Sequence, residues 1–111
     1  MYINRKENYT SILPDESTFR EFFMALSSQM PLLEDQHLII RVSKNLDVSE
    51  KDFFLLLEVA EKQSVNHKSF VVVYPPKINN DIFPEHFNIV PTYAEAEDII
   101  KMEAIERDLS F

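Results

Sequence analysis

The sequence predicts an α/β fold, in which helices pack against a mixed β-sheet. Two near-continuous apolar runs rich in β-branched residues, 37–43 and 70–74, are typical of strands buried on both faces. Between them, residues 49–63 place apolar side chains on one face of a helix. A strand, a helix and a strand in this order form a βαβ unit with a parallel strand pair. The 111 residues have the commonest size of one domain, so we expect a single domain over residues 1–111.

The N-terminal third predicts two short strands followed by a helix. Residues 2–12 carry Tyr, Ile and Thr around a polar centre, which is typical of two strands joined by a turn. After Pro14, residues 15–17 offer N-cap candidates for the helix. Pro31 is expected to limit how far this helix runs. Its apolar side chains recur with the period of a helix, at Phe19, Phe22, Phe23, Leu26 and Met30.

The C-terminal third predicts a short strand over 87–90 and a last helix over about 92–109. Thr92 and Glu95 have the spacing of a capping box, in which the two side chains satisfy free N–H groups at the start of a helix. Oppositely charged side chains four residues apart support the helix nearly to the end of the chain.

The composition excludes several classes of function. The chain has no Gly, although average usage of roughly 7% would give about eight. Glycine-rich phosphate loops are therefore excluded, because the backbone must approach the phosphate closely there. The absence of Cys excludes disulfides, thiol nucleophiles and thiolate zinc sites. The net charge of −8 argues against a nucleic-acid partner.

No motif in the chain predicts catalysis, a cofactor or a metal site. The three histidines, His37, His67 and His86, lack the close spacing that would place two imidazoles on one metal ion. No long apolar run or signal-peptide segment is present, so we expect no membrane association and a cytoplasmic location. The sequence thus predicts a protein that is not an enzyme.

A hydroxyl at the start of the middle helix is the sharpest local feature of the sequence. Ser49, close behind Asp47, is placed to cap this helix. The same position favours a phosphate, because free N–H groups and the positive end of the helix dipole meet there. Glu50 and Asp52 already place negative charge in the first turn, which works against phosphorylation. We therefore interpret Ser49 mainly as an N-cap, with phosphorylation as the alternative.

Two sets of apolar side chains fall outside the predicted core faces. Leu55 and Val59 point away from the core face of the middle helix, so either another helix covers them or they form a docking patch. Met102, Ile105 and Leu109 form a second stripe on the last helix. This stripe is expected to dock a protein partner or a second copy of the chain, unless the domain itself covers both faces of the helix.

The end of the chain, Asn88–Leu109, resembles the ending of a bacterial subgroup of short STAS-like proteins. It reads NIVPTYAEAEDIIKMEAIERDL, and the resemblance covers about residues 37–109. STAS-like domains are found in anti-sigma-factor antagonists and in the tails of sulphate transporters. The resemblance implies a STAS-like mixed sheet with helices packed against it. It also implies a regulatory protein–protein interaction module.

In the antagonists, one strand ends in a turn whose second hydroxyl is phosphorylated by a partner kinase. By position this turn falls on residues 47–51, where Asp47 and Ser49 match the family and the other three positions depart from it. The resemblance therefore implies a degenerate phosphorylation site, with a working switch at Ser49 as the alternative. Members of the subgroup are often labelled ribonuclease Z, so an accessory partner of that enzyme is a further alternative.

Overall fold

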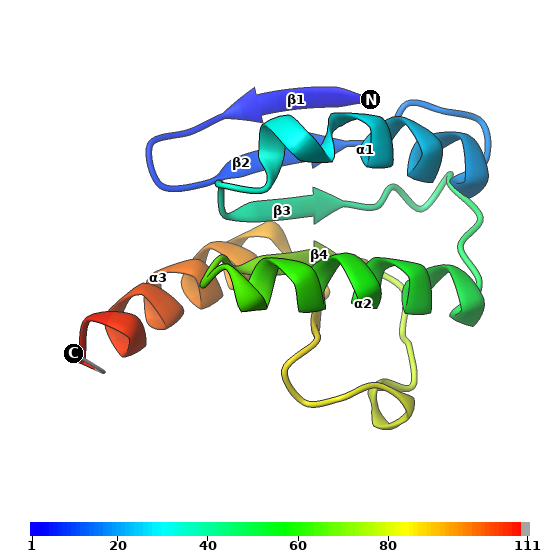
Figure 1. The fold of residues 1–111 in the computed structure, drawn as a ribbon. Coiled ribbons are helices and arrows are strands. Elements are labelled where there is room, and N and C mark those ends of the chain that lie inside the picture. The colour runs from blue at the N-terminus through cyan, green and yellow to red at the C-terminus, as the bar shows by residue number, and fades with distance from the viewer. Residues whose placement is uncertain (110–111) are drawn as a thin grey trace.

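The chain forms a five-stranded mixed sheet with helices on both faces, as the computed structural model shows for residues 1–109 (Figure 1). The α/β fold class predicted from the sequence is confirmed. Strand order in the sheet equals strand order in the chain, with the first pair antiparallel and the other pairs parallel. The strands are β1 (Tyr2–Arg5), β2 (Thr10–Leu13), β3 (Leu38–Arg41), β4 (Phe70–Val73) and β5 (Asn88–Val90).

Two helices share one face of the sheet and the third covers the other face. Helix α1 (Phe19–Leu33) connects β2 to β3, and α2 (Glu50–Val65) connects β3 to β4. Both connections step the same way along the sheet, and right-handed crossovers then place both helices on the same side. Helix α3 (Tyr93–Leu109) follows the last strand and folds back over the opposite face (Figure 1).

Side chains that alternate along the central strands separate two hydrophobic clusters. Leu38, Ile40 and Val72 point toward α1 and α2, where they form the larger cluster. Their neighbours in the strands point the other way and pack against α3. The smaller cluster consists of Ile39, Val71, Val73, Ala96 and Ile100. The apolar runs therefore reflect strands covered on both faces, as the sequence predicts.

Helix α1 differs from the prediction at both ends. Its N-cap is Thr18, whose hydroxyl accepts a hydrogen bond from the Glu21 N–H at 3.2 Å, so the predicted caps over 15–17 were wrong. The helix also continues through Pro31 to Leu33. A proline removes only one helical hydrogen bond at its own position. Leu33 is fully buried in the core, which favours keeping the last turn helical.

The starts of the other two helices agree with those predicted from the sequence. Helix α2 begins after Ser49, and α3 begins after Thr92, whose hydroxyl accepts from the Glu95 N–H at 3.2 Å. The Thr92 hydroxyl also contacts the Glu95 carboxylate, so only half of the predicted capping box is formed. A single turn of 3-10 helix, η1 (Asn80–Ile82), lies in the connection between β4 and β5. Among residues 1–109, no helix is long and apolar enough to cross a membrane.

Candidate functional site

The first half of α3 is fixed to the sheet by apolar packing and by a hydroxyl network. Ala96 and Ile100 are buried against β3 and β4. The Tyr9 hydroxyl lies 2.7 Å from the Tyr93 hydroxyl and donates to the Glu97 carboxylate at 2.7 Å. Burial, together with these two hydrogen bonds, raises the pKa of Tyr9, which stays a neutral donor. These contacts fix the direction in which the helix leaves the sheet.

The second half of α3 extends beyond the sheet (Figure 1). Met102, Ile105 and Leu109 expose 59%, 58% and 81% of their surface. We call these three residues the α3 stripe. The stripe predicted from the sequence is therefore exposed in this chain, and the domain does not cover it.

The second predicted patch is divided by the packing of the two helices. Val59 is buried and lines, together with Phe23 and Met30 of α1, a groove between α1 and α2. Its proposed place in a docking patch was therefore wrong, because α1 lies alongside and covers it. Leu55 remains partly exposed. Leu55 and Val59 thus form no common exposed surface.

Ser49 occupies the N-cap of α2 with both hydrogen bonds of a capping box. Its hydroxyl accepts from the Asp52 N–H at 3.3 Å, and its own N–H donates to the Asp52 carboxylate at 2.9 Å. Asp47 and Ser49 are both exposed. Ser49 lies at the opposite end of the molecule from the end of α3 (Figure 1). The fold therefore does not bring the predicted phosphosite and the α3 stripe together.

Replacing Ser49 with alanine is expected to lower the free energy of unfolding by about 0.5–2 kcal/mol, because the Asp52 N–H loses its hydroxyl acceptor. Ser49→Asp should have a much smaller effect, since a carboxylate also caps. Ser28→Ala, inside α1, serves as the control and should change stability little. Denaturant melts compare the three variants. Equal stability of Ser49→Ala and the wild type would contradict the capping role.

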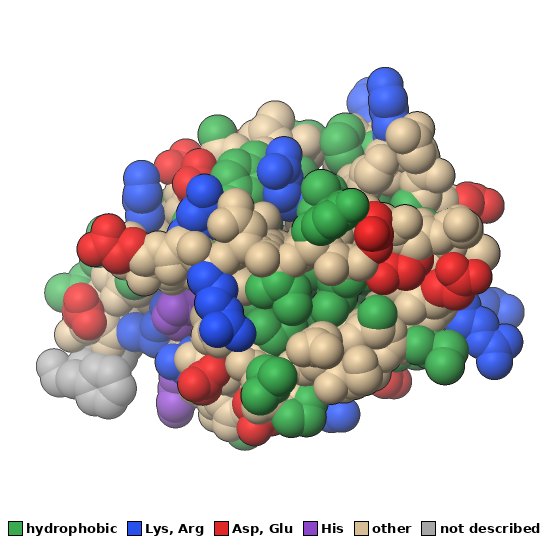
Figure 2. All heavy atoms as spheres, turned by 90° about the horizontal axis from the view of Figure 1, so that it is seen from above, with side chains coloured by type: hydrophobic (Ala, Val, Ile, Leu, Met, Phe, Trp, Pro, Cys, Tyr) green, Lys and Arg blue, Asp and Glu red, His purple; other side chains and the backbone are tan. Residues whose placement is uncertain are grey.

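A pocket that was not predicted from the sequence lies at the edge of the sheet where the parallel strands begin. His37, His67 and His86 precede β3, β4 and β5, and these parallel neighbours start at the same edge. Figure 2 shows histidines beside Lys and Arg side chains at one end of the molecule. A pocket of about 300 Å³, here called the edge pocket, opens there. It is lined by Ala60, Ser64, His67, Lys68, Ser69, Phe70, His86, Asn88, Glu103, Glu106 and Arg107.

Arg107 reaches from α3 to the start of β4 at this edge. One guanidinium nitrogen, Nη1, donates to the Ser69 hydroxyl at 3.2 Å. The other, Nη2, is buried and has no hydrogen-bond acceptor among residues 1–109. Asn88 donates to the Glu103 carboxylate at 3.4 Å on the other side of the pocket. The pocket therefore contains a guanidinium whose hydrogen-bonding capacity is only partly used.

His37 lies beside the pocket as a neutral imidazole. Its Nδ1 accepts the Ser69 N–H at 2.9 Å, which requires that this nitrogen carries no proton. Burial, followed by the positive charges of Arg107 and Lys68, lowers the pKa of His37, while Glu103 acts in the opposite sense. Within the described residues, no group of His, Cys, Asp and Glu side chains is placed to hold a metal ion. Arg107 and Lys68 share this edge with the carboxylates of Glu103 and Glu106.

Comparisons with protein-family models and with curated proteins find no match for this chain.

Proposed function

We propose that the chain is a non-catalytic, cytoplasmic STAS-like interaction module that docks a protein partner or a second copy of itself. The α3 stripe carries this proposal, because three large apolar side chains stand exposed on a helix whose first half is fixed to the sheet. The helix therefore presents the stripe in a defined direction. The net charge of −8 favours a protein over a nucleic acid as the partner.

The free energy of burying the α3 stripe limits the strength of the interaction. Burying one such side chain contributes about 1.5–3 kcal/mol before the costs of association are subtracted. Three side chains from each side would therefore support a weak or transient complex, as is common for regulatory modules. Phosphorylation at Ser49 is not part of the proposal, since the hydroxyl already caps α2.

The double variant Met102→Glu with Leu109→Glu tests the proposal. It should abolish self-association or partner capture and leave the melting temperature nearly unchanged, because both side chains are exposed. Light scattering over a concentration series measures self-association, and pull-down from native lysate followed by mass spectrometry measures partner capture. The matched control is Met24→Glu with Leu32→Glu on α1, whose side chains are 64% and 65% exposed.

Four outcomes are informative. Loss of association only in the α3 variant supports the proposal. Equal loss in the α1 control would show that exposed apolar surface in general causes the association. A strictly monomeric wild type that captures no partner would contradict the proposal, and a large loss of stability in the α3 variant would assign the stripe to the core.

A further inference from the structure

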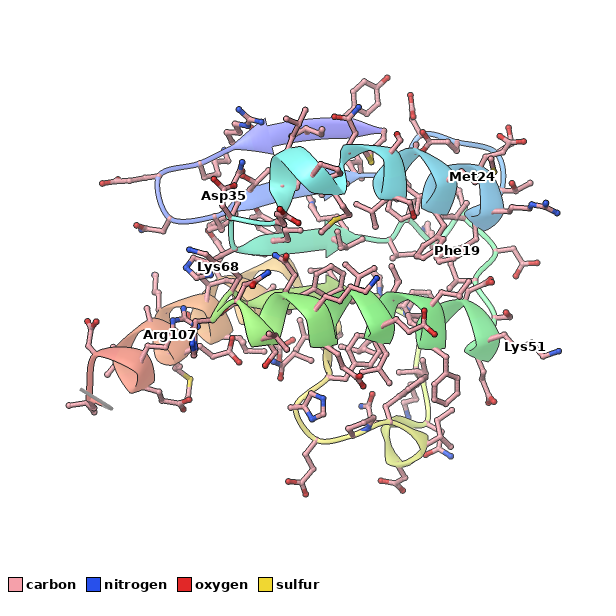
Figure 3. The ribbon with its side chains drawn as sticks, in the orientation of Figure 1. Phe19, Met24, Asp35, Lys51, Lys68 and Arg107 are labelled. Carbon is pink, nitrogen blue, oxygen red and sulfur yellow. The ribbon has the colours of Figure 1, made fainter. Side chains whose placement is uncertain are left out.

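The edge pocket brings two cationic side chains together at one end of an acidic chain. The net charge is −8, yet Lys68 and Arg107 line one pocket together with His67 and His86. Hydroxyl groups of Ser64 and Ser69 line the same space. Lys68 and Arg107 lie at the same end of the molecule, far from Lys51 at the start of α2 (Figure 3). Since Glu103 and Glu106 also line the pocket, its formal charges balance, and an anion would have to be held by direct contacts with Lys68 and Arg107.

The guanidinium of Arg107 has an unused hydrogen-bond donor that an anion could accept from. Its Nη2 is buried without an acceptor among the described residues, although its Nη1 is bonded to Ser69. A buried donor without a partner is unfavourable, and more so when it carries charge. A planar guanidinium suits the oxygens of a phosphate, since two parallel N–H groups can be engaged at once.

His67 has a backbone conformation that normally favours glycine. Its φ is +59°, just after the end of α2, where Lys68 N–H bonds to the Gln63 carbonyl at 2.8 Å. Glycine is the usual residue at this helix end, because a side chain is disfavoured in the left-handed region. The fold instead retains an imidazole that lines the pocket. The positive φ therefore belongs to the cap of α2, and it sets the direction in which the His67 side chain leaves the backbone.

We propose that the edge pocket binds a small molecule through a phosphate group, held by Arg107, Lys68 and His67. His67 and Lys68 come from the connection between α2 and β4, and Arg107 comes from α3, so these side chains line the space from two segments of the chain. The pocket volume of about 300 Å³ is at the lower end of the range for small-molecule sites, roughly 300–1,000 Å³. The pocket shares no residue with the α3 stripe and would take a different kind of ligand, so the inference goes beyond the proposed function.

Two carboxylates also line the pocket and set the strength of binding. Glu103, which accepts from Asn88, and Glu106 both place negative charge near the anion. Their repulsion lowers the affinity, so exchange of the ligand should be easy. Glu103→Gln should therefore tighten phosphate binding. Removing the carboxylate should thus raise the affinity for phosphate, whereas removing a cationic side chain should lower it.

Titration with inorganic phosphate, followed by amide chemical shifts in NMR spectra of the full chain, tests the inference. Saturable shifts are expected at residues around 67–69 and 107, and acetate at equal ionic strength should bind more weakly. Arg107→Met and Lys68→Met should each weaken binding by about ten-fold or more, as expected when a charge-assisted hydrogen bond is lost. Lys51→Met removes the same charge at the far end of the molecule and should leave the affinity unchanged.

His67→Gly separates a ligand role from a structural role. It should raise the melting temperature, because glycine relieves the positive φ, and it should weaken phosphate binding. If Arg107→Met does not fold, Lys68→Met, Glu103→Gln and His67→Gly decide the question. Absence of saturable shifts in the wild type would overturn the inference. Equal weakening by Lys51→Met, or equally tight acetate binding, would also overturn it, because charge alone would then explain the shifts.

Discussion

Replacing Phe53 with alanine is expected to lower the free energy of unfolding by about 3–5 kcal/mol. The ring lies in the larger hydrophobic cluster, with its centroid 5.0 Å from that of Tyr74 and 6.0 Å from that of Phe83. The substitution removes these edge-to-face contacts and leaves a cavity that rigid neighbours fill only in part. Since domains of this size are stable by only about 5–15 kcal/mol, the variant should unfold at a much lower denaturant concentration.

Phe54→Ala is the matched control, because the two residues are adjacent in α2 and have the same side chain. Phe53 is 1% exposed and Phe54 is 44% exposed. Phe54 contacts the ring of Phe83 at 4.9 Å, so its loss should cost only about 1 kcal/mol. Chemical denaturation with a constant m-value measures both. Similar losses for both variants would show that α2 is not anchored through Phe53.

Replacing Pro31 with alanine is expected to raise the free energy of unfolding by about 2 kcal/mol. Alanine is about 3 kcal/mol more favourable than proline inside a helix, and the freer unfolded chain takes back about 0.4–1 kcal/mol. Pro31 is exposed within α1 and offers no N–H to the Ser27 carbonyl. Alanine restores this hydrogen bond without disturbing the core.

Pro91→Ala provides the control, since Pro91 precedes α3 and lies outside every helix. It should give no gain and a small loss, because only the entropy of the unfolded chain changes. Thermal or denaturant melts of both variants decide the comparison. A loss of stability in Pro31→Ala would show that the proline shapes α1 so that Leu33 can reach its buried position.

The parts of the fold that sequence reasoning predicted are those governed by local pattern. The apolar strands, the helical periodicity of α2 and the Ser49 cap each depend on neighbouring residues, so the sequence displays them directly. The course of α1 through Pro31 was not predicted. There the burial of Leu33, a tertiary effect, outweighs the local preference of proline to end a helix.

The two candidate sites differ in the same way: one depends on local spacing and the other on tertiary structure. The α3 stripe was predicted because helical spacing alone separates its face from that of Ala96 and Ile100. The edge pocket was not predicted, since its histidines come from separate loops and meet only through the order of the strands. The available signal was that each histidine stands shortly before a strand. Using it requires knowing that the three strands are parallel neighbours.

The agreement between strand order in the sheet and strand order in the chain has a consequence for how the protein folds. Each strand pairs with its immediate predecessor, so no strand has to wait for a distant segment before it can pair. The sheet can grow from the N-terminus while the chain is being synthesised. Until α3 arrives, however, Ile39, Val71 and Val73 lack their cover, and this nascent face is exposed to aggregation. The packing of α3 on the sheet is therefore the step that protects the growing chain from aggregation.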